Sequence, residues 1–191
     1  MSIIATDLDG TIFKGQTLID GVKEGLLKII NEGIEIYYTT NNSSQTPSEI
    51  KDKLENLLQL DIDISKIITP LVIFQNLYSD DKLNIFIYGS ENLKKYIKNL
   101  NMNVTSLENA ELVLIGRKEE NNFSEINEII KSVSIGKNIL SLNKDLTFTT
   151  EVGEKAGNGA VVKIIEDELS ISIPTLGKSG NHYSSYFIQN R

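Results

Sequence analysis

The chain has 191 residues, of which 40% are hydrophobic and 24% charged, with a formal net charge of −7 and no cysteine. This composition is typical of a soluble globular protein with one core, or with a core domain that carries a smaller insertion. The negative charge argues against nucleic acid or an anionic membrane as a partner. The lack of cysteine excludes disulfides, thiolate catalysis and cysteine-bound metals.

Targeting and membrane segments are not expected. No apolar run approaches the ~20 residues of a membrane span. The N-terminal segment has no basic start and is interrupted by Asp7, so it does not match a signal peptide. We therefore expect a cytoplasmic protein.

Strands and helices are expected to alternate along the chain, which predicts an α/β fold. In the first part, the hydrophobic pattern predicts strands over residues 2–7 and 34–40, with helices over 21–31, from 47 onwards and near 70–79. From about residue 80 a second α/β unit is expected, with strands over 84–88, 112–115 and 138–142 and helices over 91–100 and 123–133. A long loop over 143–159, a helix over 160–169, an extended segment over 174–176 and a last short helix after 180 complete the prediction.

Two carboxylates stand at the end of the first predicted strand. Asp7 and Asp9 are two residues apart, so in an extended segment their side chains point the same way. Open α/β sheets bind ligands at the carboxyl ends of their strands. Two acids this close must share a proton or a cation, and Mg²⁺ prefers such oxygen ligands while keeping waters that a substrate phosphate can displace. The alternative is a polar strand-to-turn junction, in which Asp and Gly10 serve only the turn.

Two further polar motifs also follow predicted strands. Residues 39–44 read Thr-Thr-Asn-Asn-Ser-Ser, whose hydroxyls, amides and backbone N–H groups can hold phosphoryl oxygens. Gly177-Lys178 adds a cation, and lysine is an effective point charge for phosphate. The alternatives are a polar loop that leads into a capped helix and an ordinary solvated surface lysine.

The order of these three motifs resembles the haloacid dehalogenase superfamily. More narrowly, the chain resembles the NagD/4-nitrophenylphosphatase-type branch, in which a large α/β cap is inserted between the second and third motifs. Residues 9–21, 68–70, 115–116 and 143–145 also match that branch. The resemblance implies a Rossmann-like core domain with a parallel sheet, from residues 1–78 and 172–191, and an inserted α/β cap domain over residues 79–171.

The resemblance also implies a role for each motif residue. Asp7 would be the nucleophile that forms an aspartyl-phosphate, and Asp9 would be the general acid and base. Asp7 and the backbone carbonyl of Asp9 would hold Mg²⁺, while Thr40, Lys178 and the backbone of Asn41 would bind the phosphoryl group. The substrate would be a small phosphorylated metabolite.

Substrate selection is expected in the cap. Asn143 and Asp145 are the candidates for contacting the substrate, and the alternative is that they form a simple turn after a strand. The resemblance also makes a homodimer plausible.

The sequence departs from the family after Lys178, where no Asp or Glu follows. The family carries a fourth motif there, with acidic residues that complete the metal site and a strand that lies beside the first one. The first strand should therefore be an edge of its sheet. Three explanations stay open: the chain is a fragment of a longer protein, a partner supplies the missing part, or the protein is degenerate. We favour the fragment, because residues 184–188 look like the start of a helix that is cut short.

Two other functions remain as alternatives to a Mg²⁺-dependent phosphatase. One is a non-catalytic protein that binds a phosphorylated ligand, or a regulatory protein, without a complete metal site. The other is an assembly module that completes its sheet with a strand from a partner.

Overall fold

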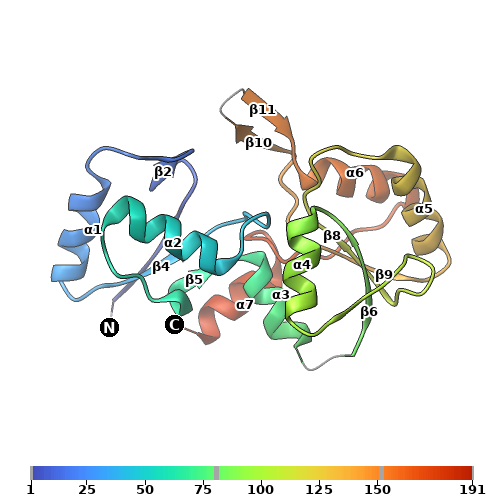
Figure 1. The fold of residues 1–191 in the computed structure, drawn as a ribbon, viewed down its shortest axis with the longest axis horizontal. Coiled ribbons are helices and arrows are strands. Elements are labelled where there is room, and N and C mark those ends of the chain that lie inside the picture. The colour runs from blue at the N-terminus through green and yellow to red at the C-terminus, as the bar shows by residue number, and fades with distance from the viewer. Residues whose placement is uncertain (1, 80–81, 151–152, 191) are drawn as a thin grey trace.

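The structure is a computed structural model that describes residues 2–79, 82–150 and 153–190. The chain forms two lobes, each built around a parallel sheet, and helices α3 (Pro70–Tyr78) and α7 (Asn181–Gln189) lie between them (Figure 1). This arrangement confirms the predicted α/β class.

The first lobe positions the two N-terminal motifs. Its sheet has the order β1-β4-β5, with β1 (Ile3–Asp7), β4 (Glu35–Thr39) and β5 (Ile67–Ile68) all parallel. The lobe also contains the hairpin of β2 (Phe13–Lys14) and β3 (Thr17–Leu18), the helices α1 (Val22–Asn31) and α2 (Pro47–Leu58), and the 3-10 turn η1 (Ile64–Lys66). The pairing of β1 with β4 sets Asp7 beside Thr39, so both motifs leave the sheet at the same edge.

The start of α2 follows from the sequence pattern. The Thr46 hydroxyl accepts a hydrogen bond from the backbone N–H of Glu49, and the Glu49 carboxylate accepts one from the backbone N–H of Thr46. These reciprocal bonds form a capping box, with Pro47 at the first helical position. The prediction of this helix start is confirmed.

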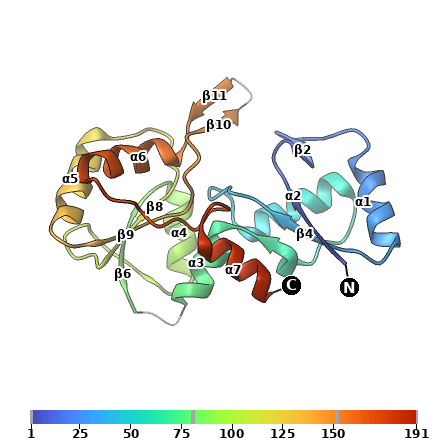
Figure 2. The same cartoon turned by 180° about the vertical axis from the view of Figure 1, so that it is seen from behind.

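The second lobe contains a four-stranded parallel sheet in the order β7-β6-β8-β9. Its strands are β6 (Asn84–Tyr88), β7 (Asn103–Val104), β8 (Leu112–Ile115) and β9 (Asn138–Ser141), and its helices are α4 (Glu91–Asn99), α5 (Phe123–Ser134) and α6 (Asn158–Leu169). All four residues of β8 are buried, as expected for an apolar inner strand covered on both faces. The hairpin of β10 (Thr147–Thr150) and β11 (Gly153–Ala156) projects from this lobe (Figures 1 and 2).

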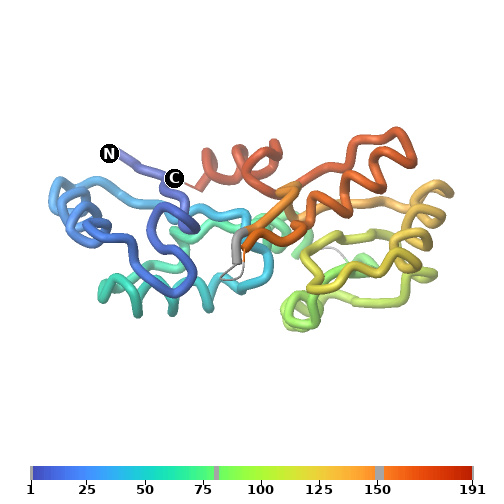
Figure 3. Tube along the Cα trace, turned by 90° about the horizontal axis from the view of Figure 1, so that it is seen from above, coloured from blue at the N-terminus to red at the C-terminus, as the bar shows by residue number. Residues whose placement is uncertain are grey.

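One apolar cluster joins the two lobes. Phe74 of α3 is fully buried in it, together with Tyr37 of the first sheet, Ile85 and Leu114 of the second sheet, and Tyr183 of α7. Figure 3 shows α7 lying over the middle of the molecule. The lobes are therefore packed against each other and are not merely tethered.

Some predictions need correction. Residues 143–159 are not one long loop, because the β-branched and aromatic residues of β10 pair with β11, and α6 begins at Asn158. The extended segment over 174–176 is not a full strand: among the described residues it makes a single bridge, in which Thr175 pairs with Ser141 at the end of β9. The two-residue strands β2, β3, β5 and β7 are too short to give a periodic pattern.

The first strand lies at an edge of its sheet in the described part of the chain, as predicted. Ile4 and Ala5 of this strand are exposed. No helix among the described residues is both long and apolar enough to cross a membrane.

Candidate active site

Asp7 and Lys178 meet at the carboxyl end of β1. The Lys178 Nζ lies 2.6 Å from the Asp7 Oδ1, which also accepts a hydrogen bond from the backbone N–H of Leu8 at 2.7 Å. The Asp7 side chain is 49% exposed, so this carboxylate remains open to a ligand. The first and third motifs, nearly the whole chain apart, thus form one site.

Asp9 lies next to this ion pair and has a perturbed pKa. Its carboxyl reaches solvent, but surrounding protein atoms partly desolvate it, and this raises the pKa of Asp9 above its ordinary value. The charge of Asp7 raises this pKa further, while Lys53, Lys178 and Arg117 oppose the shift. A carboxyl group with a raised pKa can hold a proton nearer neutral pH and then release it.

Three cations make the site locally positive in a protein of net charge −7. Lys178 follows the bridge at Thr175, Lys53 comes from α2, and Arg117 comes from the second lobe, just after β8. The Lys53 Nζ also lies 3.5 Å from the centre of the Phe13 ring in the β2–β3 hairpin. An anion such as phosphate would be attracted to this place.

Thr40 directly follows β4. It is 2% exposed, and its backbone N–H donates to the carbonyl oxygen of Ile68 at 3.1 Å. Its hydroxyl oxygen accepts from the backbone N–H of Asn42 at 3.0 Å. No acceptor for the Thr40 hydroxyl proton is found among the described residues, so a phosphoryl oxygen could accept it.

Asn41 links the motifs to the second lobe. Its side-chain oxygen accepts from the backbone N–H of Lys178 at 2.7 Å, and its side-chain NH₂ donates to the Asp145 carboxylate at 3.0 Å. Its carbonyl oxygen accepts from the Asn143 NH₂ group at 2.9 Å. The Asn41 side chain is thus occupied by bonds within the protein. This leaves its backbone N–H as the group for the predicted phosphate contact.

The structure gives Asn143 and Asp145 a position between the lobes. Asn143 is 7% exposed, and its side-chain oxygen accepts from the backbone N–H of Asp145 at 3.2 Å. Both side chains bond to Asn41, as described above, so they hold the second lobe against the polar segment over residues 39–44. That Asn143 and Asp145 contact the substrate stays a prediction.

Glycines allow the loops at this junction to approach closely. A Cβ on Gly177 would lie 3.0 Å from the Asn41 Oδ1, and a Cβ on Gly159 would lie 2.1 Å from the carbonyl oxygen of Lys144. The second contact is impossible for any other residue without movement of the backbone. Gly159 therefore helps to fix the segment that carries Asn143 and Asp145.

The oxygen donors at the site fit a hydrated Mg²⁺ ion. Asp7 offers a partly exposed carboxylate, and Asp9, two residues on, is near enough for the charge of Asp7 to raise its pKa. Mg²⁺ is commonly bound by one or two carboxylates together with waters and substrate phosphate. Among the described residues, no group of three or more acidic or histidine side chains could hold a metal ion.

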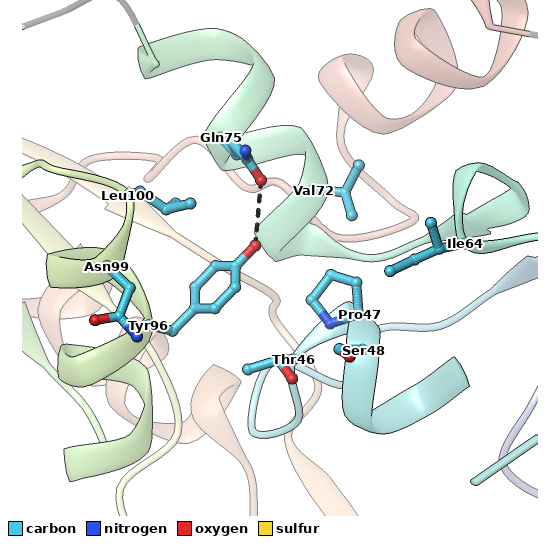
Figure 4. A pocket seen from close by; sticks show the side chains of 9 residues that line it. All are labelled: Thr46, Pro47, Ser48, Ile64, Val72, Gln75, Tyr96, Asn99 and Leu100. Atoms are coloured by element: carbon cyan, nitrogen blue, oxygen red, sulfur yellow. Dashed lines mark hydrogen bonds between the residues drawn. The ribbon is translucent and has the colours of Figure 1, made fainter. Parts of the chain in front are cut away.

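A separate cavity of about 450 Å³ lies between α2, α3 and α4 (Figure 4). On one side of the cavity, the Tyr96 hydroxyl donates a hydrogen bond to the Gln75 side-chain oxygen at 3.3 Å. No charged residue and none of the predicted site residues lines this cavity. The cavity is therefore a weaker candidate for the active site than the region around Asp7.

Three residues of the site were not singled out from the sequence. Lys53 and Arg117 interact electrostatically with Asp9, and Tyr183 of α7 interacts with Asp7 while its hydroxyl donates to the Ile68 carbonyl oxygen at 2.8 Å. The only sequence signal for Arg117 was its position directly after a predicted strand. Lys53 and Tyr183 lie within helices, where a single polar residue gives no signal.

A protein-family model described as haloacid dehalogenase-like hydrolase matches residues 4–103, slightly more than half of the chain. Among curated relatives, a protein named acid sugar phosphatase from Staphylococcus epidermidis is 28% identical over 174 residues, which cover 90% of this chain and 67% of the relative. The acid sugar phosphatase of Staphylococcus haemolyticus is 29% identical, with 90% and 66% covered. The chain thus spans about two thirds of these relatives' length.

Solved structures show the same fold. The p-nitrophenyl phosphatase from Archaeoglobus fulgidus superimposes with a TM-score of 0.88 at 20% identity, covering 99% of this chain and 73% of that one. A mutant of a thermostable p-nitrophenylphosphatase from Bacillus stearothermophilus gives a TM-score of 0.78 at 27% identity, covering 99% and 74%.

Proposed function

Because the chain belongs to the haloacid dehalogenase-like hydrolase family, we propose that it is a phosphatase of small phosphorylated metabolites that acts through an aspartyl-phosphate. The observation that carries this proposal is the meeting of Asp7, Asp9 and Lys178 at one sheet edge, with the Asp7 carboxylate partly exposed beside a lysine. Phosphoryl transfer needs mainly positioning and charge neutralisation, and this site offers both.

The residues divide the chemistry between two carboxylates. An oxygen of Asp7 attacks phosphorus, the bond to the ester oxygen breaks, and protonated Asp9 gives its proton to that leaving oxygen. The Asp9 carboxylate then takes a proton from water, which attacks the aspartyl-phosphate and releases inorganic phosphate and free Asp7. The raised pKa of Asp9 supports this role, because the group must be protonated in one step and ionised in the next.

The phosphoryl oxygens are held by Lys178 and Thr40, with the backbone of Asn41 beside them. Asp7 and the backbone carbonyl of Asp9 would hold Mg²⁺, which when bound neutralises charge on the phosphoryl group. The Nζ of Lys178, which pairs with Asp7 in the free protein, is placed to share its charge with the incoming phosphate.

Sugar phosphates are the proposed substrate class. The relatives named acid sugar phosphatase support this choice, and the similarity to p-nitrophenylphosphatases supports p-nitrophenyl phosphate as the assay substrate. The second lobe, which faces the motifs through Asn143 and Asp145, would select among sugars.

The Asp7→Asn variant tests the proposal. We expect kcat for p-nitrophenyl phosphate with Mg²⁺ to fall by at least about a thousandfold, because an amide cannot act as the nucleophile. Binding of inorganic phosphate, measured by calorimetry, should remain measurable. The matched control is Asp167→Asn, which removes one negative charge from an exposed ion pair on α6 and should keep wild-type turnover.

Unchanged turnover in Asp7→Asn would refute the nucleophile assignment. A wild-type protein that binds phosphate but shows no Mg²⁺-dependent hydrolysis of p-nitrophenyl phosphate or glucose 6-phosphate would instead support the non-catalytic binding protein.

A further inference from the structure

Arg117 is a cation of the second lobe whose backbone is fixed at the site. It directly follows β8 and Gly116, and the backbone N–H of Gly116 donates to the Tyr88 carbonyl oxygen at 2.8 Å. The carbonyl oxygen of Arg117 accepts from the backbone N–H of Ser90 at 2.9 Å. These bonds tie the Arg117 backbone to the loop that follows β6, the neighbouring strand.

The Arg117 side chain rests on an aromatic ring. Its guanidinium carbon lies 4.3 Å from the centre of the Phe148 ring in the β10–β11 hairpin, and both residues are partly buried. Stacking of this kind holds a guanidinium plane while leaving its edge N–H donors free. Within residues 2–79, 82–150 and 153–190, no hydrogen bond or ion pair is made by this guanidinium.

Arg117 also lies within electrostatic range of Asp9. It and Asp9 attract each other electrostatically, although they come from different lobes. Glu119, an exposed residue of the same loop, also acts electrostatically on Arg117, and in the part of the chain that the structure describes the two form no ion pair. Desolvation therefore lowers the pKa of Arg117, and among the described residues the opposing charges of Glu119 and Asp9 act on it without direct contact.

The chemistry at Asp9 indicates what could occupy this place. Under the proposed function, Asp9 protonates the leaving oxygen, so the leaving group extends from the phosphate towards Asp9 and the second lobe. A group on its far end can then come near the free N–H donors of Arg117. Guanidinium donors match an anionic oxygen pair best.

We propose that Arg117, supported by Phe148, binds a second anionic group carried by the leaving group of the substrate. The site then prefers phosphate monoesters that also bear a carboxylate or another phosphate over neutral monoesters of the same size. This inference rests on the proposed function for the direction of the leaving group. Among small phosphorylated metabolites, it favours those whose leaving group carries a second anionic group, whether a sugar or a short acid.

The test compares two ligands that differ in one group. 3-Phosphoglycerate carries a carboxylate where glycerol 3-phosphate carries a neutral CH₂OH, and both have the same phosphate. Their dissociation constants are measured by calorimetry with the 191-residue chain in EDTA, which prevents Mg²⁺-dependent turnover. We expect wild type to bind 3-phosphoglycerate on the order of tenfold more tightly, as for a charged hydrogen bond.

The Arg117→Gln variant should lose this preference and bind both ligands about equally. The matched control is Lys118→Gln, which removes the same charge one residue away, where the lysine pairs with Glu125 and lies over the Tyr88 ring. This control should keep the wild-type preference. A Phe148→Leu variant should lower the preference, because the guanidinium loses its aromatic support.

Two results would overturn the inference. In the first, wild type binds 3-phosphoglycerate and glycerol 3-phosphate with equal dissociation constants. In the second, Arg117→Gln weakens the binding of both ligands equally, which would mean that Arg117 contacts their shared phosphate. Hydrolysis is assayed separately with p-nitrophenyl phosphate and Mg²⁺. If turnover is absent while the selective loss in Arg117→Gln is found, the proposed function fails and the anion site stands.

Discussion

At the scale of single residues, the site shows a conflict between stability and chemistry at Asp9. Its pKa is raised above the ordinary value of 3.8, mainly by desolvation and then by the charge of Asp7. The folded protein therefore binds more protons than the unfolded chain between pH 3.8 and the raised pKa. Stability is lost as the pH rises through this window, and the full penalty remains at neutral pH.

The Asp9→Asn variant should consequently be more stable than wild type at pH 7, and this difference should shrink as the pH falls towards 4. Urea unfolding at several pH values measures it. Asp63 provides a control of opposite sign, since hydrogen bonds from Ser65 lower its pKa. Asp63→Asn should destabilise the protein at pH 7 and matter less at low pH. An Asp9→Asn variant that is less stable than wild type at pH 7 would contradict this account.

Residues were predictable where several of them form an ordered motif. Asp7 is the last residue of an expected strand, Asp9 comes just after it, and Lys178 follows an expected extended segment. Parallel strands bring such ends together, so the meeting of these residues could be predicted. Lys53 and Arg117 could not be, because nothing in a single lysine or arginine says which lobe or face it will meet. Only the packing of the two lobes brings Arg117 to Asp9.

At the scale of elements, the junction between β9, the β10–β11 hairpin and α6 depends on a close backbone contact. A Cβ on Gly159 would lie 2.1 Å from the Lys144 carbonyl oxygen and 2.9 Å from the Asp145 carbonyl carbon. Gly159→Ala should therefore shift α6 or this loop and cost about 1–3 kcal/mol of unfolding free energy. It should also lower kcat/KM, because the same segment carries Asn143 and Asp145.

Gly25 is the matched control for this substitution. It lies within α1 with no atom near its missing Cβ and without a positive φ, so Gly25→Ala should stabilise the protein by about 0.5–1 kcal/mol. Urea unfolding measures the stability of both variants. If Gly159→Ala were as stable as wild type, the backbone at Lys144 and Asp145 could move aside without cost, which would contradict this account.

Elements with a strong local pattern were predicted closely, and short ones were not. The strands over 84–88 and 112–115 have the predicted bounds, and the capping box gives the start of α2. The β10–β11 hairpin was missed, because its charged second strand is fully exposed and shows no alternation. Its pairing depends on the partner strand and not on its own hydrophobicity.

At the scale of the whole molecule, the two lobes share one core. Phe74 of α3 is fully buried among residues of both sheets, and Asn41 adds hydrogen bonds to Asn143 and Asp145 across the junction. Lobes joined by buried apolar contacts should unfold together, since opening one would expose the apolar surface of the other. The sequence alone predicted an inserted second unit but not this shared core.

Hydrogen exchange of the amides in β4 and β8 tests this cooperativity, because these strands belong to different lobes. We expect the most protected amides of both strands to exchange with the same opening free energy, and Phe74→Ala to lower both values together by about 3–5 kcal/mol. Phe123→Ala, which removes a ring that is 68% exposed on α5, should leave both values nearly unchanged. If Phe74→Ala lowered the protection of only one strand, the lobes would be independent folding units. The electrostatic contact of Arg117 with Asp9 would then depend on a hinge between the lobes and not on a shared core.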